Sequence, residues 1–304
     1  MANPAYVAVD WGTSSFRLWL IGADGGILAE RRSDEGMTST AKTGFSTVLA
    51  SHLAAIEAPE SLPVIVCGMA GAKQGWVEAG YIDVPAPLAS ILTGAVSVPG
   101  ESRDVRILPG LAQRDRVTPD VMRGEETQLL GALGSASSGA QAVCMPGTHS
   151  KWVHVIDGRV AGFSTFMTGE LFDAISKHTI LSHAVAGAEG QPADAAAFEA
   201  AVSAAFARPA LASNLLFTAR SGQLLHGISA AAAQARLSGT LIGLEIAGAL
   251  RDTSSADITL VASGRLQALY EQAFGALSLA FTTIDADAAV RRGLSAAAEA
   301  IWPN

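Results

Sequence analysis

A turn near the N-terminus carries residue types that hold phosphate groups. Asp10 and Gly12 follow an apolar run that begins at Tyr6, and the hydroxyl residues Thr13 and Ser14 precede a second apolar run. Gly12 lets backbone N–H groups approach phosphate oxygens, and the hydroxyls can donate hydrogen bonds to them. Asp10, at the end of a predicted strand, is suited to hold a hydrated Mg²⁺. An ordinary hairpin with a polar turn would show the same pattern, so this stretch alone leaves both interpretations open.

A second stretch repeats this order of strand, Gly-Thr turn and strand. It spans 142–156, and its turn contains Gly147, Thr148 and His149. When Gly12 is laid on Gly147, the flanking apolar runs also align. The two copies lie about 135 residues apart, and a repeat of this kind predicts two homologous half-domains. We expect them to face each other across a cleft and to offer one loop each to the same polyphosphate.

Two adjacent acids, Glu125 and Glu126, stand shortly before the second turn and open an apolar helical pattern. One interpretation is structural, because carboxylates are favourable in the first turn of a helix. The other is that one of them accepts a proton from a substrate. Their position, where the two half-domains must meet, favours the second interpretation for at least one of the two.

A glycine-rich loop follows the buried strand predicted at 63–67. Ligands in open α/β sheets bind at the carboxyl ends of strands, so this loop is a candidate wall of a sugar site. A plain surface loop is the alternative. The candidate substrate residues in it are Gly68, Met69, Gly71, Lys73 and Trp76.

Two further polar turns each lie between a predicted strand and a helix. Thr168 and Glu170 form a second possible patch near the ligand, although a helix N-cap at Thr168 explains the pattern equally well. Ala262, Ser263 and Gly264 follow the strand predicted at 258–261. A turn of small residues lets a flat base or ribose approach the backbone, so it is a third candidate nucleotide element.

The composition is typical of a globular enzyme with a large core. The chain has 304 residues, 49% hydrophobic and 16% charged, with a net charge of −8. An acidic chain without a basic block is a poor nucleic-acid binder. We see no apolar run of membrane-spanning length, and Cys67 and Cys144 lie in apolar runs typical of buried thiols. We therefore expect a cytoplasmic protein that binds small molecules and neither nucleic acid nor membranes.

The pattern predicts an α/β protein in which strands and helices position these turns. Three antiparallel strands are expected from Tyr6 through the run that begins at Ile27, and a second such meander at about 142–166. Further strands are predicted at 63–67, 105–110, 258–261 and 279–284. Helices are predicted at 45–58, after Glu125, at 265–274, at 285–301, and in pieces of the Ala-rich segment 193–250.

This division places one half-domain at 1–134 and the other at 135–284. We expect the C-terminal helix, 285–304, to pack back on the first half-domain. The order of phosphate loop, acidic helix, second phosphate loop and adenosine element resembles the sugar kinase/actin/Hsp70 superfamily of duplicated ribonuclease H-like domains.

Longer strings resemble one family within it, the 2-dehydro-3-deoxygalactonokinases. The strings Met-Arg-Gly-Glu-Glu-Thr-Gln-Leu (122–129) and Pro-Gly-Thr-His-Ser-Lys-Trp (146–152) are specific, whereas the first loop alone is not. Further matches lie at 8–13, at 68–71 with 75–76, and at 167–171. The resemblance covers essentially the whole chain.

The resemblance implies phosphoryl transfer from MgATP to the 6-hydroxyl of 2-dehydro-3-deoxy-D-galactonate, a step of galactonate catabolism. It implies that Glu126 or Glu125 accepts the hydroxyl proton and that Asp10 holds Mg²⁺ or serves as the base. The first Gly-Thr turn would cradle the γ-phosphate, and the second would contact the β- and γ-phosphates. Lys73, the backbone of 68–71 and Arg123 would hold the substrate carboxylate.

Other functions use the same loops. A phosphohydrolase like the exopolyphosphatases would replace the sugar hydroxyl by water, and a kinase could prefer another keto-deoxy sugar acid or its epimer. A non-catalytic, ATP-switched binding protein ranks lowest, because the sequence shows no long insertion. The pattern leaves a homodimer open.

Overall fold

The computed structural model describes residues 3–134, 138–251 and 257–303. The chain divides into two compact units. Unit 1 comprises Met1–Gly139, His154–Phe163 and Ile284–Asn304, and unit 2 comprises Ala140–Val153 and Ser164–Thr283. The C-terminal helix therefore belongs with the N-terminal residues.

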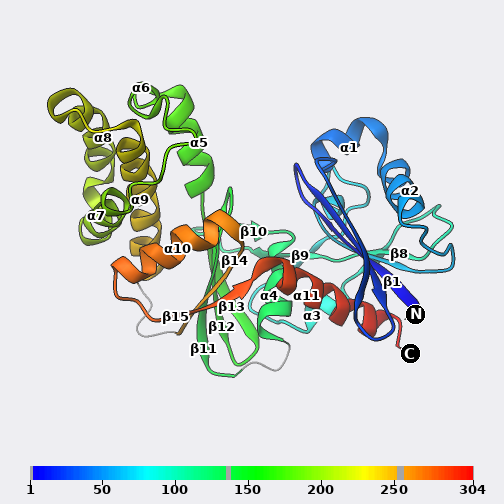
Figure 1. The fold of residues 1–304 in the computed structure, drawn as a ribbon. Helices are drawn as coiled ribbons and strands as arrows, with labels where there is room; N and C mark the ends of the chain where they lie inside the picture. Colours follow the sequence, from blue (N-terminus) through cyan, green and yellow to red (C-terminus); the bar gives the residue numbers. More distant parts are fainter. Residues whose placement is uncertain (1–2, 135–137, 252–256, 304) are drawn as a thin grey trace. The chain divides into compact units, whose positions relative to one another are not determined.

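The main sheet of unit 1 has the strand order β3-β2-β1-β4-β8-β7 (Figure 1). Strands β1, β2 and β3 form the predicted antiparallel meander, and β4 and β8 extend the sheet in parallel to β1. Every residue of β4 is buried, as expected of a β-branched run in the middle of a sheet. The bounds are β1 (Pro4–Trp11), β2 (Phe16–Gly22), β3 (Ile27–Ser33), β4 (Val64–Gly68), β7 (Val96–Ser97) and β8 (Val105–Ile107).

A second six-stranded sheet has the order β15-β14-β11-β12-β13-β6, with β14 parallel to β11. Its first five strands repeat the order of β8, β4, β1, β2 and β3, which is the ribonuclease H-like arrangement. The duplicated α/β fold is therefore confirmed. The bounds are β6 (Ala86–Pro87), β11 (Ala140–Met145), β12 (Ser150–Ile156), β13 (Arg159–Phe166), β14 (Asp257–Ala262) and β15 (Phe281–Asp285).

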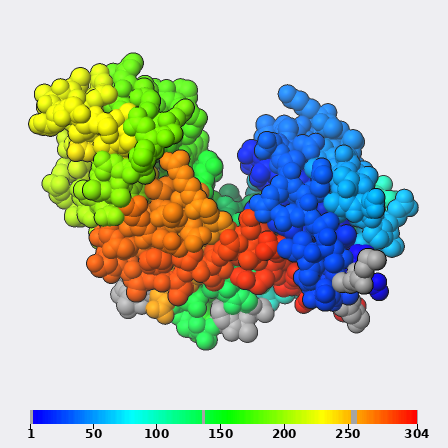
Figure 2. All heavy atoms as spheres, viewed as in Figure 1, coloured from blue at the N-terminus to red at the C-terminus, as the bar shows by residue number. Residues whose placement is uncertain are grey.

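Helices α4 (Glu125–Leu133) and α11 (Ala286–Ile301) pack closely in unit 1. A Cβ at Gly131 would lie 1.9 Å from the carbonyl oxygen of Ala289, and one at Gly293 would lie 2.0 Å from that of Thr127. The two glycines therefore let the helix backbones touch. Figure 2 shows α11, in red, against the blue N-terminal residues. The other helices of unit 1 are α1 (Met37–Thr43), α2 (Phe45–Ala55) and α3 (Ser90–Thr93).

Unit 2 contains the Ala-rich helices. The structure has one helix, α9, where the sequence suggested two pieces between 229 and 250. Gly239 and Gly243 of α9 lie against the backbone of α7, where an added Cβ would come within 2.5 Å of a carbonyl oxygen. Glycine at these two positions therefore allows close packing of α9 on α7. The bounds are α5 (Thr168–His178), α6 (Ser182–Val185), α7 (Ala195–Ala207), α8 (Ala212–His226), α9 (Ala230–Ala249) and α10 (Gly264–Ala276).

Some elements were not predicted. Helix α1 was not predicted from the sequence, and helix α2 ends three residues before the predicted position 58. A small sheet of order β10-β9-β5 was missed because its strands have only three or four residues. Its bounds are β5 (Tyr81–Asp83), β9 (Gly110–Gln113) and β10 (Asp120–Met122).

Over the described ranges, no helix taken singly has the length and hydropathy to cross a membrane. One pair, Ala195–Ala207 with Pro209–His226, passes that test by length and composition, with a bend of 112° at its break.

Candidate active site

The first Gly-Thr turn is supported by the start of helix α1. The carbonyl oxygens of Gly12 and Thr13 accept hydrogen bonds of 3.0 and 3.1 Å from the backbone N–H groups of the first two residues of α1. A Cβ at Gly36 would lie 2.5 Å from the backbone of Ser14, so glycine is required for this approach. The Thr13 and Ser14 side chains are exposed, which makes their hydroxyls accessible to a ligand.

The second Gly-Thr turn is supported in the same way by the start of helix α5. The backbone N–H of Glu170 donates to the carbonyl oxygen of Thr148 at 3.0 Å. A Cβ at Gly169 would lie 2.5 Å from the carbonyl oxygen of Gly147. The repeat seen in the sequence therefore extends to the segment that fixes each turn.

Two predicted residues meet beside this second turn. His149 Nε2 lies 2.5 Å from Glu170 Oε2, and both side chains are half exposed. Thr168 is buried and is the first helical residue, so the alternative interpretation as an N-cap is wrong; Met167 holds that position. The pairing brings the predicted phosphate ligand and the predicted polar patch together.

Asp10 lies at the carboxyl end of β1 and is almost buried. Arg17 on β2 donates to Asp10 Oδ2, and the thiol of Cys67 on β4 lies 3.7 Å from Oδ1. Burial raises the pKa of the Cys67 thiol well above its usual value, with Asp10 and Glu126 adding to the rise. Gly68 has φ +89°, and a Cβ there would lie 3.4 Å from Asp10 Oδ1 and closer still to the Trp11 backbone. Asp10 is thus held in a fixed orientation.

Glu125 and Glu126 form the first turn of α4, and Gly124 with φ 105° is its N-cap. Glu126 is fully buried, accepting hydrogen bonds from the Gly124 N–H at 2.7 Å and the Thr127 hydroxyl at 3.0 Å. Burial raises the pKa of Glu126 to about 8, and the neighbouring Glu125 carboxylate contributes to the rise. Glu125 is partly exposed and accepts from the Arg123 N–H at 3.0 Å.

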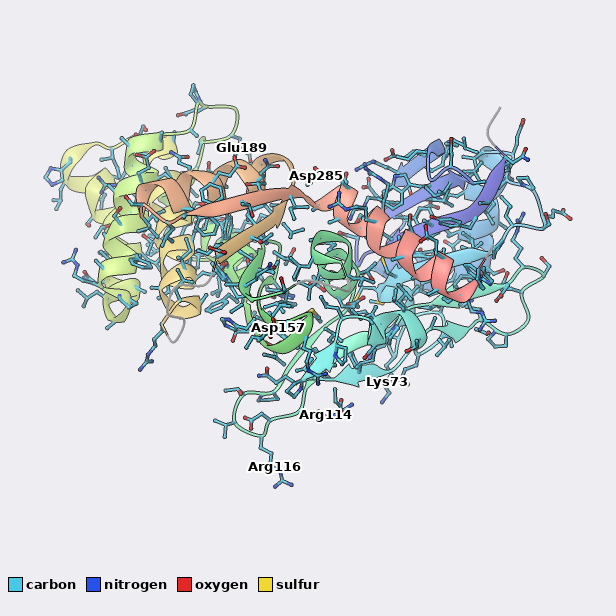
Figure 3. All side chains as sticks on the ribbon, turned by 90° about the horizontal axis from the view of Figure 1, so that it is seen from below. Lys73, Arg114, Arg116, Asp157, Glu189 and Asp285 are labelled. Carbon is cyan, nitrogen blue, oxygen red and sulfur yellow. The ribbon has the colours of Figure 1, made fainter. Side chains whose placement is uncertain are left out.

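Residues in and around the candidate sugar loop are mostly engaged in packing and hydrogen bonds within the protein. Arg123 donates to the carbonyl oxygens of Ala79 and Gly80 at 3.2 and 2.9 Å and lies over the Tyr81 ring. Trp76 stacks on an aromatic ring of helix α2, with centroids 5.9 Å apart. Met69 is partly buried and Gly71 fully buried, whereas Lys73 is exposed and points away from the ribbon in Figure 3. The exposed part of this wall is therefore small.

Unit 2 contains a cavity of about 210 Å³, which is lined by Arg265 directly after the candidate adenosine element but not by Ala262, Ser263 or Gly264 themselves. The cavity wall includes Gly147 of the second turn, Arg265 of α10, and apolar residues of α9 and α10 such as Ile242 and Leu269. A larger cavity, of about 410 Å³, shares Ser238, Arg265 and Leu269 with it. A candidate phosphate-binding turn at the edge of an apolar cavity is an arrangement that suits a nucleotide whose base lies inside.

The small-residue turn before helix α10 has the expected form. Ala262 is the buried last residue of β14, Ser263 is extended, and Gly264 has φ +61° with no heavy atom within 4 Å of an added Cβ. The backbone is therefore open to a flat group at this point.

Sequence reasoning missed Glu245, a buried carboxylate of α9. It accepts hydrogen bonds from Trp152 Nε1 at 2.8 Å and from the Tyr270 hydroxyl at 2.7 Å, and it also bonds to Thr168. Burial raises the pKa of Glu245, whereas these hydrogen bonds lower it. Because Tyr270 and Thr168 line the smaller cavity, Glu245 fixes its walls. Its only sequence signal is a single acid among apolar helical positions.

Asp10 suits a cation held mainly by phosphates. Among the described residues, no group of three or more His, Cys, Asp or Glu side chains could hold a metal. Mg²⁺ in phosphoryl-transfer sites commonly needs only one or two carboxylates, because water and phosphate oxygens complete its shell. One fixed carboxylate beside a phosphate-binding turn fits this requirement.

Comparisons with known proteins show one family. A sequence profile of the 2-keto-3-deoxy-galactonokinase family matches residues 10–297. A protein of Rhizobium meliloti named probable 2-dehydro-3-deoxygalactonokinase is 66% identical over 299 residues, covering 98% of each chain. The 2-dehydro-3-deoxygalactonokinase of Escherichia coli is 37% identical over 298 residues, covering 97% of this chain and 98% of the relative.

Solved structures agree with the fold. A crystal structure from Sinorhizobium meliloti, provisionally described as a 2-dehydro-3-deoxygalactonokinase, has a TM-score of 0.95 at 65% identity, covering 98% of this chain and 100% of that one. An activator of 2-hydroxyisocaproyl-CoA dehydratase from Clostridium difficile has a TM-score of 0.50 at 11% identity, covering 97% and 95%, and shows likeness of fold alone. The profile match and the high identity over nearly the full length show that this chain belongs to the 2-keto-3-deoxy-galactonokinase family.

Proposed function

We propose that this protein transfers the terminal phosphoryl group of ATP to the 6-hydroxyl of 2-dehydro-3-deoxy-D-galactonate. The structural observation that carries the proposal is the cavity in unit 2 that the second Gly-Thr turn and helix α10 both line. It suits a nucleotide whose phosphates extend from the cavity to Gly147. The acceptor is taken from the activity that the names of the relatives state.

Phosphoryl transfer requires positioning and charge neutralisation more than covalent chemistry by the protein. The first turn (Gly12, Thr13, Ser14) holds the γ-phosphate, and the second turn (Gly147, Thr148, His149) holds the β- and γ-phosphates. Asp10 would hold Mg²⁺, which would supply positive charge to the phosphate oxygens. The contact with Arg17 fixes the Asp10 carboxylate in place beside the first turn, and we assign Asp10 to the cation and not to proton transfer.

The proton acceptor is one of the two acids that open helix α4. A pKa of about 8 is well matched to a base that works near neutral pH, which favours Glu126. Its carboxylate is fully buried, so contact with a sugar hydroxyl requires the turn at Gly124 to move. Glu125 is partly exposed and needs no such movement. Separate Gln variants at the two positions distinguish them.

We assign the substrate carboxylate to the backbone of the loop that begins at Gly68 and Met69, and to Lys73. The Arg123 Nη1 and Nη2 atoms already donate to backbone carbonyls, so this side chain orients the loop. We further propose that the half-domains close over the substrate to exclude water. Small-angle scattering that stays unchanged with an ATP analogue and the sugar acid would contradict closure.

A coupled assay of ADP formation with a panel of 2-keto-3-deoxy sugar acids tests the function. We expect ADP to form only when an acceptor is present, with the galacto epimer preferred. Glu126→Gln should reduce kcat by about 10²–10⁴-fold with little change in ATP affinity, as for loss of a general base. If ADP forms as fast without acceptor, the protein is a phosphohydrolase and the proposal fails.

A further inference from the structure

A row of side chains crosses the sheet of unit 1 at the level of Asp10. Asp10 on β1 is paired in register with Arg17 on β2, and Arg17 is paired with Arg32 on β3. Residues directly opposite each other on neighbouring strands point to the same face of a sheet. The candidate cation ligand is therefore the end member of a cross-strand row of charges.

Asp287, in the first turn of helix α11, completes this row. Arg17 donates through Nη2 to Asp10 Oδ2 and through Nη1 to Asp287 Oδ1. Arg32 Nη2 donates to Asp287 Oδ2 at 2.7 Å. Each oxygen of Asp287 thus has its own guanidinium, and Arg17 is shared between two carboxylates.

Helix α11 brings Asp287 to this position from the far end of the chain. The chain enters unit 1 at Ile284, and α11 begins two residues later beside β1 (Figure 2). A carboxylate in a first helical turn is favourable in any case, and Asp285 already caps this helix by accepting from the Ala288 N–H at 2.8 Å. The cap therefore does not require Asp287, whose two oxygens are directed at Arg17 and Arg32.

Because Arg17 is shared between Asp10 and Asp287, Asp287 determines how much of the Arg17 positive charge acts on Asp10. The side chains of Asp10, Arg17 and Asp287 are 11%, 21% and 22% exposed, so water screens their interaction only in part. With Asp287 present, Arg17 is balanced by two negative charges. Without that charge, Arg17 would act on Asp10 alone, and Asp10 would attract a hydrated cation less strongly.

We propose that Asp287 is a positioning residue that draws part of the Arg17 charge away from Asp10 and thereby strengthens cation binding at the first phosphate turn. Asp287 contacts Asp10 only through Arg17. The inference rests on the proposed function, because it takes Asp10 as the ligand of the nucleotide-bound Mg²⁺.

Calorimetric titration with ADP, in the presence and absence of Mg²⁺, tests this role without relying on turnover. Asp287→Asn keeps the shape and removes the charge. We expect the gain in ADP affinity that Mg²⁺ provides to fall by about tenfold, as for other changes next to a metal ligand. Affinity for ADP without Mg²⁺ should stay within about twofold of the wild-type value, because the cavity in unit 2 is unchanged.

Glu30 provides the matched control. It accepts from Arg32 Nε at 2.5 Å at the outer, exposed end of the row. Glu30→Gln removes one charge from the row, as Asp287→Asn does, but should leave the Mg²⁺-dependent gain at the wild-type value. Asp287→Glu keeps the negative charge and should retain most of the gain in ADP affinity that Mg²⁺ provides.

Three results would overturn the inference. In the first, Mg²⁺ raises the ADP affinity of Asp287→Asn as much as that of the wild type. In the second, Asp287→Asn loses ADP affinity equally with and without Mg²⁺. In the third, Glu30→Gln loses as much of the Mg²⁺-dependent gain in ADP affinity as Asp287→Asn does. Should Asp287→Asn fail to fold, Asp287→Ser, which also removes the charge, is titrated in its place and judged by the same three results. A wild-type protein that binds no Mg²⁺-nucleotide would refute the proposed function as well, whereas the three results above leave that function intact.

Discussion

The backbone N–H of Glu170 donates a 3.0 Å hydrogen bond to the carbonyl oxygen of Thr148, and Thr38 makes the equivalent bond to Thr13 at 3.1 Å. In each case the chain that leaves the third strand of a meander returns to the Gly-Thr turn between the first two. The two bonds repeat within separate units, so the geometry of both candidate phosphate loops has a common structural origin.

Gly169 lets α5 reach the second turn, and Gly169→Ala should disrupt it. The new Cβ would lie 2.5 Å from the carbonyl oxygen of Gly147, and backbone atoms on both sides would have to move. We expect ATP affinity, measured by calorimetry, to fall by about tenfold or more, because misplaced phosphate ligands lose both hydrogen bonds and orientation.

Gly275→Ala is the matched control for that variant. Gly275 lies in helix α10 and has no heavy atom within 4 Å of an added Cβ. Alanine there should leave ATP affinity unchanged and stabilise the fold by up to about 1 kcal/mol through helix propensity. Equal affinities for both variants would show that the close approach at Gly169 does not support the turn.

Glu126 should make the fold less stable as the pH rises. Its pKa is about 8 in the folded protein against an ordinary 4.5, so the folded state retains a proton that the unfolded chain has lost. The stabilisation is complete below about pH 4.5 and is lost progressively up to about pH 8. The expected slope from this group is up to about 1.4 kcal/mol per pH unit.

Urea unfolding of wild type and Glu126→Gln at several pH values between 5 and 8 measures this effect. Because Gln carries no charge to desolvate, the variant should lose much less stability over that interval. Parallel curves for the two proteins would show that Glu126 is not held protonated by burial.

The same pKa gives a prediction for turnover. If Glu126 accepts the proton, kcat rises with pH and levels off above about 8, because only the ionised carboxylate is active. The profile of Glu125→Gln should keep this inflection, although the removal of a neighbouring charge lowers its position. An inflection that survives in Glu126→Gln would assign it to another group.

Glu245→Ala should be among the most destabilising single substitutions in unit 2. It removes the acceptor of the Trp152 N–H and leaves the Tyr270 hydroxyl with Ser150 Oγ, at 3.1 Å, in place of the carboxylate. A loss of about 2–4 kcal/mol in the free energy of unfolding is expected, since an unpaired buried donor and a cavity both contribute.

Tyr270→Phe removes one donor and keeps the carboxylate, so it should cost less, about 1 kcal/mol. The difference in the free energy of unfolding between the two variants shows how much Glu245 contributes as an acceptor shared by several donors, beyond its one hydrogen bond to Tyr270. A larger loss for Tyr270→Phe than for Glu245→Ala would contradict that role.

The duplicated fold was predictable because the same order of apolar run, Gly-Thr turn and apolar run occurs twice in the sequence. The apolar runs on both sides of Gly12 and Gly147 predict strands, and the repeat shows that they belong to equivalent sheets. The acids at the start of α4 and the open turn at Gly264 were also readable, because helix starts and glycine turns have local chemical causes.

Contacts between side chains that are far apart in the sequence were not predictable from these local patterns. Arg17 and Asp287 are 270 positions apart, and nothing local marks Asp287 as a partner of Arg17. The burial of Glu126 and the hydrogen bonds of Glu245 depend on which helix covers which sheet. Similarly, the donors of Arg123 are directed at backbone carbonyls that the sequence does not place near it.

Phosphoryl transfer to the 6-hydroxyl can be followed directly by ³¹P NMR of the products formed from MgATP and 2-dehydro-3-deoxy-D-galactonate. We expect a phosphomonoester signal coupled to the C6 protons that grows as fast as ADP, with no inorganic phosphate. Growth of inorganic phosphate in its place, with no phosphomonoester, would contradict this transfer.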